Sequence, residues 1–162
     1  MNISKQLRNT AISLGICKEH ADKWDNDWTT EDLVNYFMTN PNWCLKRHFP
    51  SHEILKRNFN NTFVQSKGVF VDSDVTLRAV DSSYVFLNCR SGIITKDVCR
   101  LYFGIGGVAR IIVESNGYLT VDVYDDVDLD IELRDNSSKL VVFQYGDRTP
   151  KVKGKNFKIV KK

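Results

Sequence analysis

The chain has 162 residues, of which 42% are hydrophobic and 27% charged, and its formal net charge is +3. This length suits one domain or a small helical unit joined to a β unit, and the apolar fraction is that of a globular protein. No run of about eighteen apolar residues occurs, so the sequence predicts no membrane-spanning helix.

Residues 1–5 are polar and lack the apolar core and cleavage site of a secretory signal peptide. The chain has four cysteines at irregular spacing, which favours a reducing compartment over a disulfide scaffold. We therefore expect a cytoplasmic protein without a cofactor.

The first sixty residues have the apolar spacing of short helices. Ile3, Leu7 and Ala11 recur at helical intervals behind Ser4, a candidate N-cap, and Gly15 supplies a stop. A second short helix is expected over residues 18–24.

Three further helices are predicted in this part of the chain. Thr29 stands three residues before Asp32, an acidic variant of the capping box. Pro41 suits the first turn of the next helix, while Pro50 ends that helix and Ser51 caps the last one.

All three tryptophans, Trp24, Trp28 and Trp43, lie in this helical part. One interpretation is that they form the core of a small helical head. The other is an exposed aromatic surface for a partner, since tryptophan is enriched at binding hot spots.

Two Cys/His pairs, Cys17 with His20 and Cys44 with His48, have spacings that resemble a tetrahedral zinc site. Neither pair has the tight turn of a zinc knuckle, and Cys44 lies between Trp43 and Leu45, where a small buried thiol is the ordinary explanation. We predict no metal and keep these four residues as weak candidate ligands.

From Leu87 to Gly146 the sequence repeats with a strict period of ten residues. Two apolar columns recur two residues apart, and turn-forming residues follow in each unit. The first column contains Ser91, Leu101, Ile111, Val121, Ile131 and Val141. The second column contains Ile93, Phe103, Val113, Val123, Leu133 and Phe143. Because ten is even and strand side chains alternate, both columns are expected to point into one core.

Two architectures satisfy this period. A β-solenoid of two or three strands per coil is favoured, because an insertion in one coil would break the stacked core. An antiparallel β-meander sandwich is the alternative, supported by the hairpin signal at Asn116 and Gly117. We predict an α+β protein, with a helical head or cap over residues 1–60 and a ten-residue-repeat β-solenoid with a basic C-terminal strand over residues 61–162.

Three charged surfaces are candidates for binding. Arg90, Arg100 and Arg110 recur every ten residues and form a candidate anion or phosphate surface, or an outward ladder whose stems cover apolar neighbours. Acids follow, and they suggest a solvated negative face, a Ca²⁺ site or the paired carboxylates of a glycosidase. These acids are Asp122, Asp125, Asp126, Asp128, Asp130 and Glu132.

The C-terminal segment is basic. Residues 147–162 carry seven basic side chains and one acid, and Lys151, Lys153 and Lys155 alternate as in a strand. Lysines on a terminal edge strand guard against aggregation, and phosphate contacts to nucleic acid are the functional alternative.

A resemblance to other proteins rests on Trp24, Trp28 and Trp43 and on the Phe-Pro-Ser step that ends at Ser51. The arrangement resembles uncharacterised proteins of gut Bacteroidota and their phages or prophages, which have a Trp-rich helical head and a β-repeat tail. The resemblance implies a phage or prophage setting, in host cytoplasm or virion, and assigns no functional residue. The repeat is also similar in style to bactofilin-like β-helices, from which the chain departs in its large helical head and charged outer columns.

Taken together, these patterns indicate a non-enzymatic structural or protein-interaction module that presents a rigid charged β surface to a protein partner or to itself. A nucleic-acid or nucleotide-binding module that uses the arginines and the lysine tail is the first alternative. A carbohydrate-active enzyme on the acidic face is the second.

Overall fold

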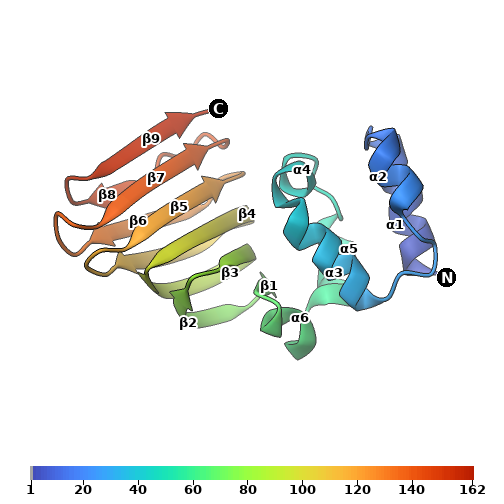
Figure 1. Cartoon of the computed structure of the whole chain (residues 1–162), viewed down its shortest axis with the longest axis horizontal. Helices are drawn as coiled ribbons and strands as arrows, with labels where there is room; N and C mark the ends of the chain where they lie inside the picture. The colour runs from blue at the N-terminus through green and yellow to red at the C-terminus, as the bar shows by residue number, and fades with distance from the viewer. Residues whose placement is uncertain (1) are drawn as a thin grey trace. The chain divides into compact units, whose positions relative to one another are not determined.

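The computed structural model describes residues 2–162, and the chain forms two compact units. The first unit ends at Phe59 and the second runs from Asn60 to Lys162. Figure 1 shows helices in the first unit and stacked strands in the second. Among the described residues, no helix has the length and apolar character needed to cross a membrane.

The first unit, called the head, contains five short helices: α1 (Ile3–Ser13), α2 (Lys18–Lys23), α3 (Thr30–Thr39), α4 (Pro41–Lys46) and α5 (His52–Phe59). The predicted capping box is confirmed, because the Thr29 hydroxyl accepts from the Asp32 N–H and the Asp32 carboxylate accepts from the Thr29 N–H. Pro41 occupies the first turn of α4, as its fixed φ favours.

The predicted Ser4 cap of α1 is wrong. Asn2 is the N-cap, with extended backbone, and its side chain accepts from the N–H of Lys5 at 3.2 Å. Ser4 is buried instead, where its hydroxyl donates to the carbonyl of Asp25 at 2.7 Å and accepts from Trp24 Nε1 at 3.0 Å. This serine serves a tertiary contact, which spacing along the helix does not reveal.

The second unit begins with a short helix that the sequence did not predict, α6 (Thr62–Ser66), capped by the side chain of Asn61. Nine strands follow: β1 (Val69–Val71), β2 (Asp74–Val80), β3 (Ser83–Lys96), β4 (Val98–Val113), β5 (Tyr118–Val123), β6 (Asp128–Leu133), β7 (Lys139–Gln144), β8 (Lys151–Lys153) and β9 (Phe157–Lys161). All their pairings are parallel, so the unit is a β-solenoid and the antiparallel meander is wrong.

The nine strands form one continuous sheet that folds into two faces, here called sheet 1 and sheet 2, because β3 and β4 each turn a corner partway along their length (Figure 1). Sheet 1 contains β1, β5, β7, β9 and the first halves of β3 and β4, and sheet 2 contains β2, β6, β8 and the second halves of β3 and β4. The Asn116-Gly117 pair is therefore the corner between β4 and β5, two parallel neighbours, rather than a hairpin.

The corners depend on left-handed backbone. At the corner that leads from sheet 1 to sheet 2, positive φ occurs at Asp72, Asn88, Ile105 and Asp125. At the corner that leads back to sheet 1, it occurs at Asp81, Asp97 and Asn116. Side chains bridge successive corners: Asn88 Nδ2 donates to Asp72 Oδ1 at 2.7 Å, and the N–H of Ile105 donates to Asp125 Oδ2 at 2.8 Å. Asp and Asn suit these positions because their short polar side chains tolerate this conformation and bond locally.

The strict ten-residue period holds only in the middle of the solenoid. Leu101 and Val121 are partners 20 residues apart, whereas Val121 and Val142 are 21 apart. The prediction that Val141 and Phe143 point inward is therefore wrong: they pair with Thr120 and Asp122 on the outer face of sheet 1. The turn between β6 and β7 has five residues, against four between β4 and β5, and a one-residue slip exchanges the two faces of a strand.

The space between the sheets is filled by side chains of aligned columns. Phe86 stacks between Phe70 and Phe103, with ring centroids 5.2 and 5.0 Å apart. Other members of this core include Cys89, Ile93, Cys99, Leu101, Ala109, Ile111, Leu119, Val121, Leu129, Ile131, Leu140 and Val142. The rigid solenoid thereby fixes the positions of the outward side chains.

Candidate functional site

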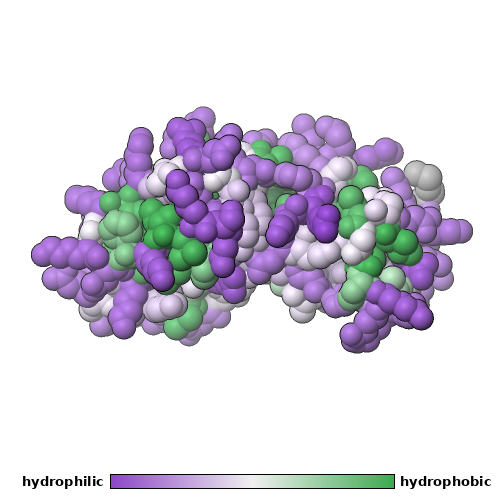
Figure 2. Space-filling model, turned by 90° about the horizontal axis from the view of Figure 1, so that it is seen from above, coloured by the Kyte–Doolittle hydropathy of each residue, from purple (hydrophilic) through white to green (hydrophobic). Residues whose placement is uncertain are grey.

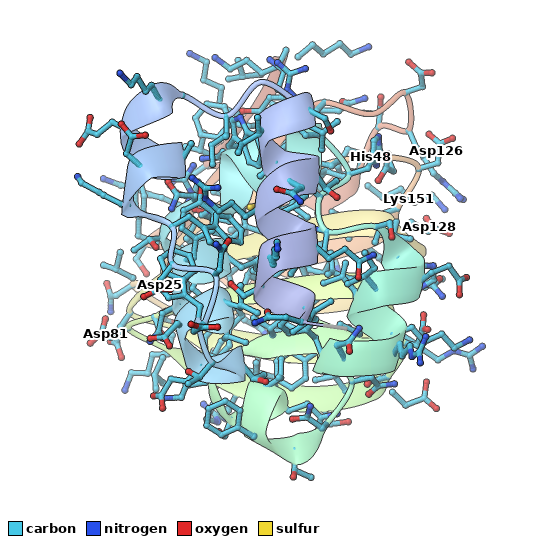
Figure 3. All side chains as sticks on the ribbon, turned by 90° about the vertical axis from the view of Figure 1, so that its right-hand side faces the viewer. Asp25, His48, Asp81, Asp126, Asp128 and Lys151 are labelled. Atoms are coloured by element: carbon cyan, nitrogen blue, oxygen red, sulfur yellow. The ribbon has the colours of Figure 1, made fainter. Side chains whose placement is uncertain are left out.

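Opposite charges lie on neighbouring strands of sheet 2. We call its outward side chains the charge ladder. Asp74 is beside Arg90, Asp130 lies between Arg110 and Lys151, and Glu132 is beside Lys153. Figure 3 shows Asp126, Asp128 and Lys151 on one side of the solenoid and Asp81 on the other. This face is a mixed-charge surface rather than a purely acidic one.

Two ion pairs reach between coils at the margins of this ladder. Arg148 Nη2 is 2.9 Å from Asp128 Oδ2, and Arg78 Nη1 is 2.8 Å from Glu114 Oε2. Both arginine side chains are more than half exposed, so each pair contributes little to stability. Their effect is to hold the carboxylates of Asp128 and Glu114 in place.

The three arginines that recur every ten residues do not form one surface. Arg90 and Arg110 both point outward on sheet 2, but Arg90 lies beside Val108, and Arg110 lies beside Gly92. Arg100 is on sheet 1. The predicted anion surface is thus divided between two sheets.

Arg100 makes a bidentate ion pair with Asp122, whose side chain has no exposed surface. Arg100 Nε and Nη2 donate to the two carboxylate oxygens at 2.9 and 3.2 Å, and the guanidinium lies 5.1 Å from the ring centre of Tyr102. The hydrogen bond with Asp122 raises the pKa of Arg100. This ion pair was not predicted from the sequence. Arg100 and Asp122 are separated by the length of one coil plus two residues, and that spacing is the signal that could have identified them.

We expect Arg100→Gln to lower the free energy of unfolding by about 2 kcal/mol, because the Asp122 carboxylate would stay buried without its cation. This loss is smaller than for a fully buried pair, since the Arg100 side chain is 39% exposed. Urea denaturation followed by circular dichroism measures it. Arg110→Gln is the matched control, and an equal loss in both variants would contradict a special role for the Arg100 pair.

At the corner between β6 and β7, Asp135 accepts hydrogen bonds from two serines. Ser115 Oγ donates to one carboxylate oxygen, and the N–H of Ser137 donates to the other at 2.9 Å. The hydrogen bond from Ser115, followed by those from Ser137, lowers the pKa of Asp135 to about 2. This corner is therefore fixed by an ionised carboxylate.

The lowered pKa of Asp135 predicts an acid-sensitive corner. Its stabilising effect is present above the ordinary pKa of 3.8 and is lost as the pH falls through about 2. We expect an NMR titration to give a midpoint near 2, and Ser115→Ala to move it upward. Ser13→Ala in the head is the control, and a native midpoint at the ordinary value would disprove this prediction.

The last strands of the solenoid carry a dense set of cations. We call β8 and β9, with the residues between and after them, the terminal edge. Its lysines are all exposed: Lys151, Lys153, Lys155, Lys158, Lys161 and Lys162. Lys151 and Lys153 lie on β8 as predicted, whereas Lys155 lies beyond Gly154 in the turn that precedes β9. The three lysines of the predicted alternation are therefore divided between a strand and a turn.

The candidate partner surface of the head is an aromatic cluster in which the three tryptophans differ in burial. Trp24 is 4% exposed and stacks on Trp28 at 4.8 Å, whereas Trp28 and Trp43 are half-buried. Trp43 packs edge-on against Phe49 at 5.4 Å. Trp24 thus belongs to the core of the head, and only Trp28 and Trp43 retain part of the predicted accessible surface.

The four weak candidate metal ligands do not come together. Cys44 is buried, burial raises the pKa of its thiol, and Cys17 is exposed. His20 Nδ1 is instead 3.3 Å from the Tyr36 hydroxyl. In the part of the chain from Asn2 onward, no three His, Cys, Asp or Glu side chains gather in a metal-binding arrangement, and this includes the six acids from Asp122 to Glu132.

Comparisons with protein-family models, curated proteins and solved structures found no match to this chain. The phage or prophage setting inferred from the resemblance stays a prediction. The assignment of function therefore depends on the surfaces described above.

Proposed function

We propose that the protein is a non-enzymatic structural or interaction module that presents a rigid, charged β surface to a protein partner. The observation that carries this proposal is the terminal edge, where β9 is paired with β7 on one side only. An unpaired strand edge offers backbone N–H and C=O groups to another chain, as in β-strand addition.

The distribution of charge supports the same proposal. Residues 147–162 have a net charge of +6, whereas the whole chain has +3, so the remainder is net negative. The field at the terminal edge therefore differs in sign from that of the rest of the molecule, which orients a charged partner during encounter.

The acids of the repeat support binding rather than catalysis. Asp122 and Asp128 are held by Arg100 and Arg148, and Asp130 lies between two cations on the charge ladder. A glycosidase requires two carboxylates facing a sugar from either side. Asp122 and Asp128 belong to different sheets, which favours a structural role for them.

Light scattering of the purified chain at low and moderate salt, with absorbance at 260 and 280 nm on the same peak, tests this proposal. We expect a protein free of nucleic acid whose mass does not depend on salt. A chain that carries nucleic acid and releases it as the salt concentration rises would contradict the proposal, because that behaviour is typical of phosphate binding.

Nucleic-acid binding through the terminal edge is the second candidate, favoured by its six exposed lysines. Binding of this kind would be independent of sequence and sensitive to salt. Anisotropy of a labelled single-stranded oligonucleotide tests it, with Lys155→Glu/Lys158→Glu as the variant. Unchanged binding by this variant would exclude the terminal edge as the site.

A further inference from the structure

On the charge ladder, the lysines of β8 lie beside acids of the neighbouring strand. The neighbours of Lys151 and Lys153 on β6 are Asp130 and Glu132. Arg110 also has Asp130 as its neighbour, and Arg90 has Asp74. Adjacent strands of sheet 2 thus juxtapose opposite charges, an arrangement that stabilises cross-strand pairs.

Among the described strands of sheet 1, β9 pairs with β7 alone, so its lysines lie at an open edge. Lys158 points outward beside Val141, and Lys161 occupies the inward column above Gln144. Both lysine side chains are exposed. Arg90, Arg110, Lys151 and Lys153 each lie beside an acid on sheet 2, whereas β7 has no acid beside Lys158 or Lys161, so the charge of β9 is not balanced by its neighbour.

The core is also incompletely covered at this end. Phe157 is 42% exposed, and Val152 and Ile159 are partly buried against the core. Figure 2, which looks onto the end of the solenoid formed by β9, shows hydrophobic residues surrounded by hydrophilic side chains. A further strand placed on β9 would cover Phe157 and Ile159, which lie in inward columns above Leu140 and Val142.

We propose that an extended acidic segment of another protein adds to β9 as the next strand of sheet 1. Apolar side chains of this segment would lie over the inward column that contains Phe157 and Ile159, and acidic side chains would lie on the outward face beside Lys158. Its backbone would pair with the open edge of β9. This inference rests on the proposed function and specifies the chemical class of the partner.

Charge complementarity favours this occupant over two others. A second copy that joins through the same edge would bring two segments of net charge +6 together, and like charges in an interface are unfavourable. A nucleic acid would neutralise the lysines but has no peptide groups to pair with β9. Only an acidic polypeptide satisfies the charge, the strand edge and the apolar columns.

A capped peptide of alternating valine and glutamate is the probe, added to the full chain and followed by fluorescence anisotropy and hydrogen exchange. We expect saturable binding that weakens with salt and slows exchange of the β9 amides. An alternating valine-lysine peptide should not bind. A valine-glutamate peptide with N-methylated edge amides should bind at least about tenfold more weakly, because strand addition needs its N–H groups.

The variant Lys158→Glu should also weaken binding of the peptide about tenfold or more, because like charges would then be neighbours. The matched control is Lys18→Glu, which makes the same charge change at an exposed position of the head and should leave binding within about twofold. Circular dichroism checks that both variants keep the native spectrum.

Three outcomes would overturn the inference. Polyglutamate that binds as well as the valine-glutamate peptide, without protecting β9, would show attraction by charge alone. An oligonucleotide that binds while the peptide does not would assign the edge to nucleic acid and would also contradict the proposed function. Self-association that protects the β9 amides and prevents the peptide from binding would assign the edge to a second copy and leave the broader interaction role intact.

Discussion

Gly107→Ala is expected to destabilise the solenoid by about 3 kcal/mol or more. Gly107 has φ of +110°, which an L side chain rarely adopts, and a Cβ there would lie 2.5 Å from the carbonyl oxygen of Cys89. It would also lie 2.9 Å from the Cys89 nitrogen, so backbone on the neighbouring strand would have to move. Strained backbone costs on the order of 1–3 kcal/mol by itself, and the steric conflict adds to it.

Gly92→Ala is the matched control, because the same atoms are added to another glycine of the same sheet. Its Cβ would meet no atom within 4 Å, and Gly92 lies on the exposed face of β3. We expect a gain of about 0.5–1 kcal/mol, since glycine in a strand has the larger entropy loss on folding. Urea denaturation followed by the β-sheet signal in circular dichroism compares the two, and similar stability of both variants would refute the role assigned to Gly107.

The second large effect is expected from Phe86→Ala, at about 3–5 kcal/mol. Phe86 is 1% exposed and stacks on Phe70 and Phe103 with interplanar angles of 12° and 15°. Loss of the Phe86 ring would leave a cavity between the rings of Phe70 and Phe103, which belong to the coils before and after it. Because the parallel coils cannot close this gap without a change of register, little relaxation is expected.

Phe63→Ala is the control for this second prediction. Phe63 lies on α6 and is 40% exposed, so its removal should change the free energy of unfolding by roughly 0.5 kcal/mol or less. Phe86→Leu keeps most of the apolar volume and should recover part of the stability. If Phe86→Ala and Phe63→Ala unfold at the same urea concentration, the aromatic stack is not a main source of stability.

Local signals in the sequence predicted the boundaries that depend on neighbouring residues. The capping box at Thr29 and Asp32 and the helix start at Pro41 are properties of a few consecutive residues, and the structure confirms both. The Ser4 cap failed because the Ser4 hydroxyl has partners 20 and 21 positions away, at Trp24 and Asp25. A contact of that kind leaves no local pattern.

The candidate sites also divide into features that the sequence shows directly and features that depend on the fold. The lysines of the terminal edge could be identified from the sequence, since charge is visible without a fold. The sequence could not show that Arg100 is bound to Asp122, because their proximity depends on the length of one coil. Nor could it show that Lys158 and Lys161 lie on an edge strand that is paired on one side only, which follows from the order of strands in the sheet.

By itself, the amino-acid sequence determined the alternation of strands and corners and the apolar columns that fill the solenoid. These follow from the period of two in a strand and from residues that accept left-handed turns. Only the tertiary structure decided the coil length, the inversion of Val141 and Phe143, and the pairs that cross from one coil to the next. The physical reason is that register depends on how many residues each corner accommodates, and a single additional residue in a turn reverses which side chains face the core.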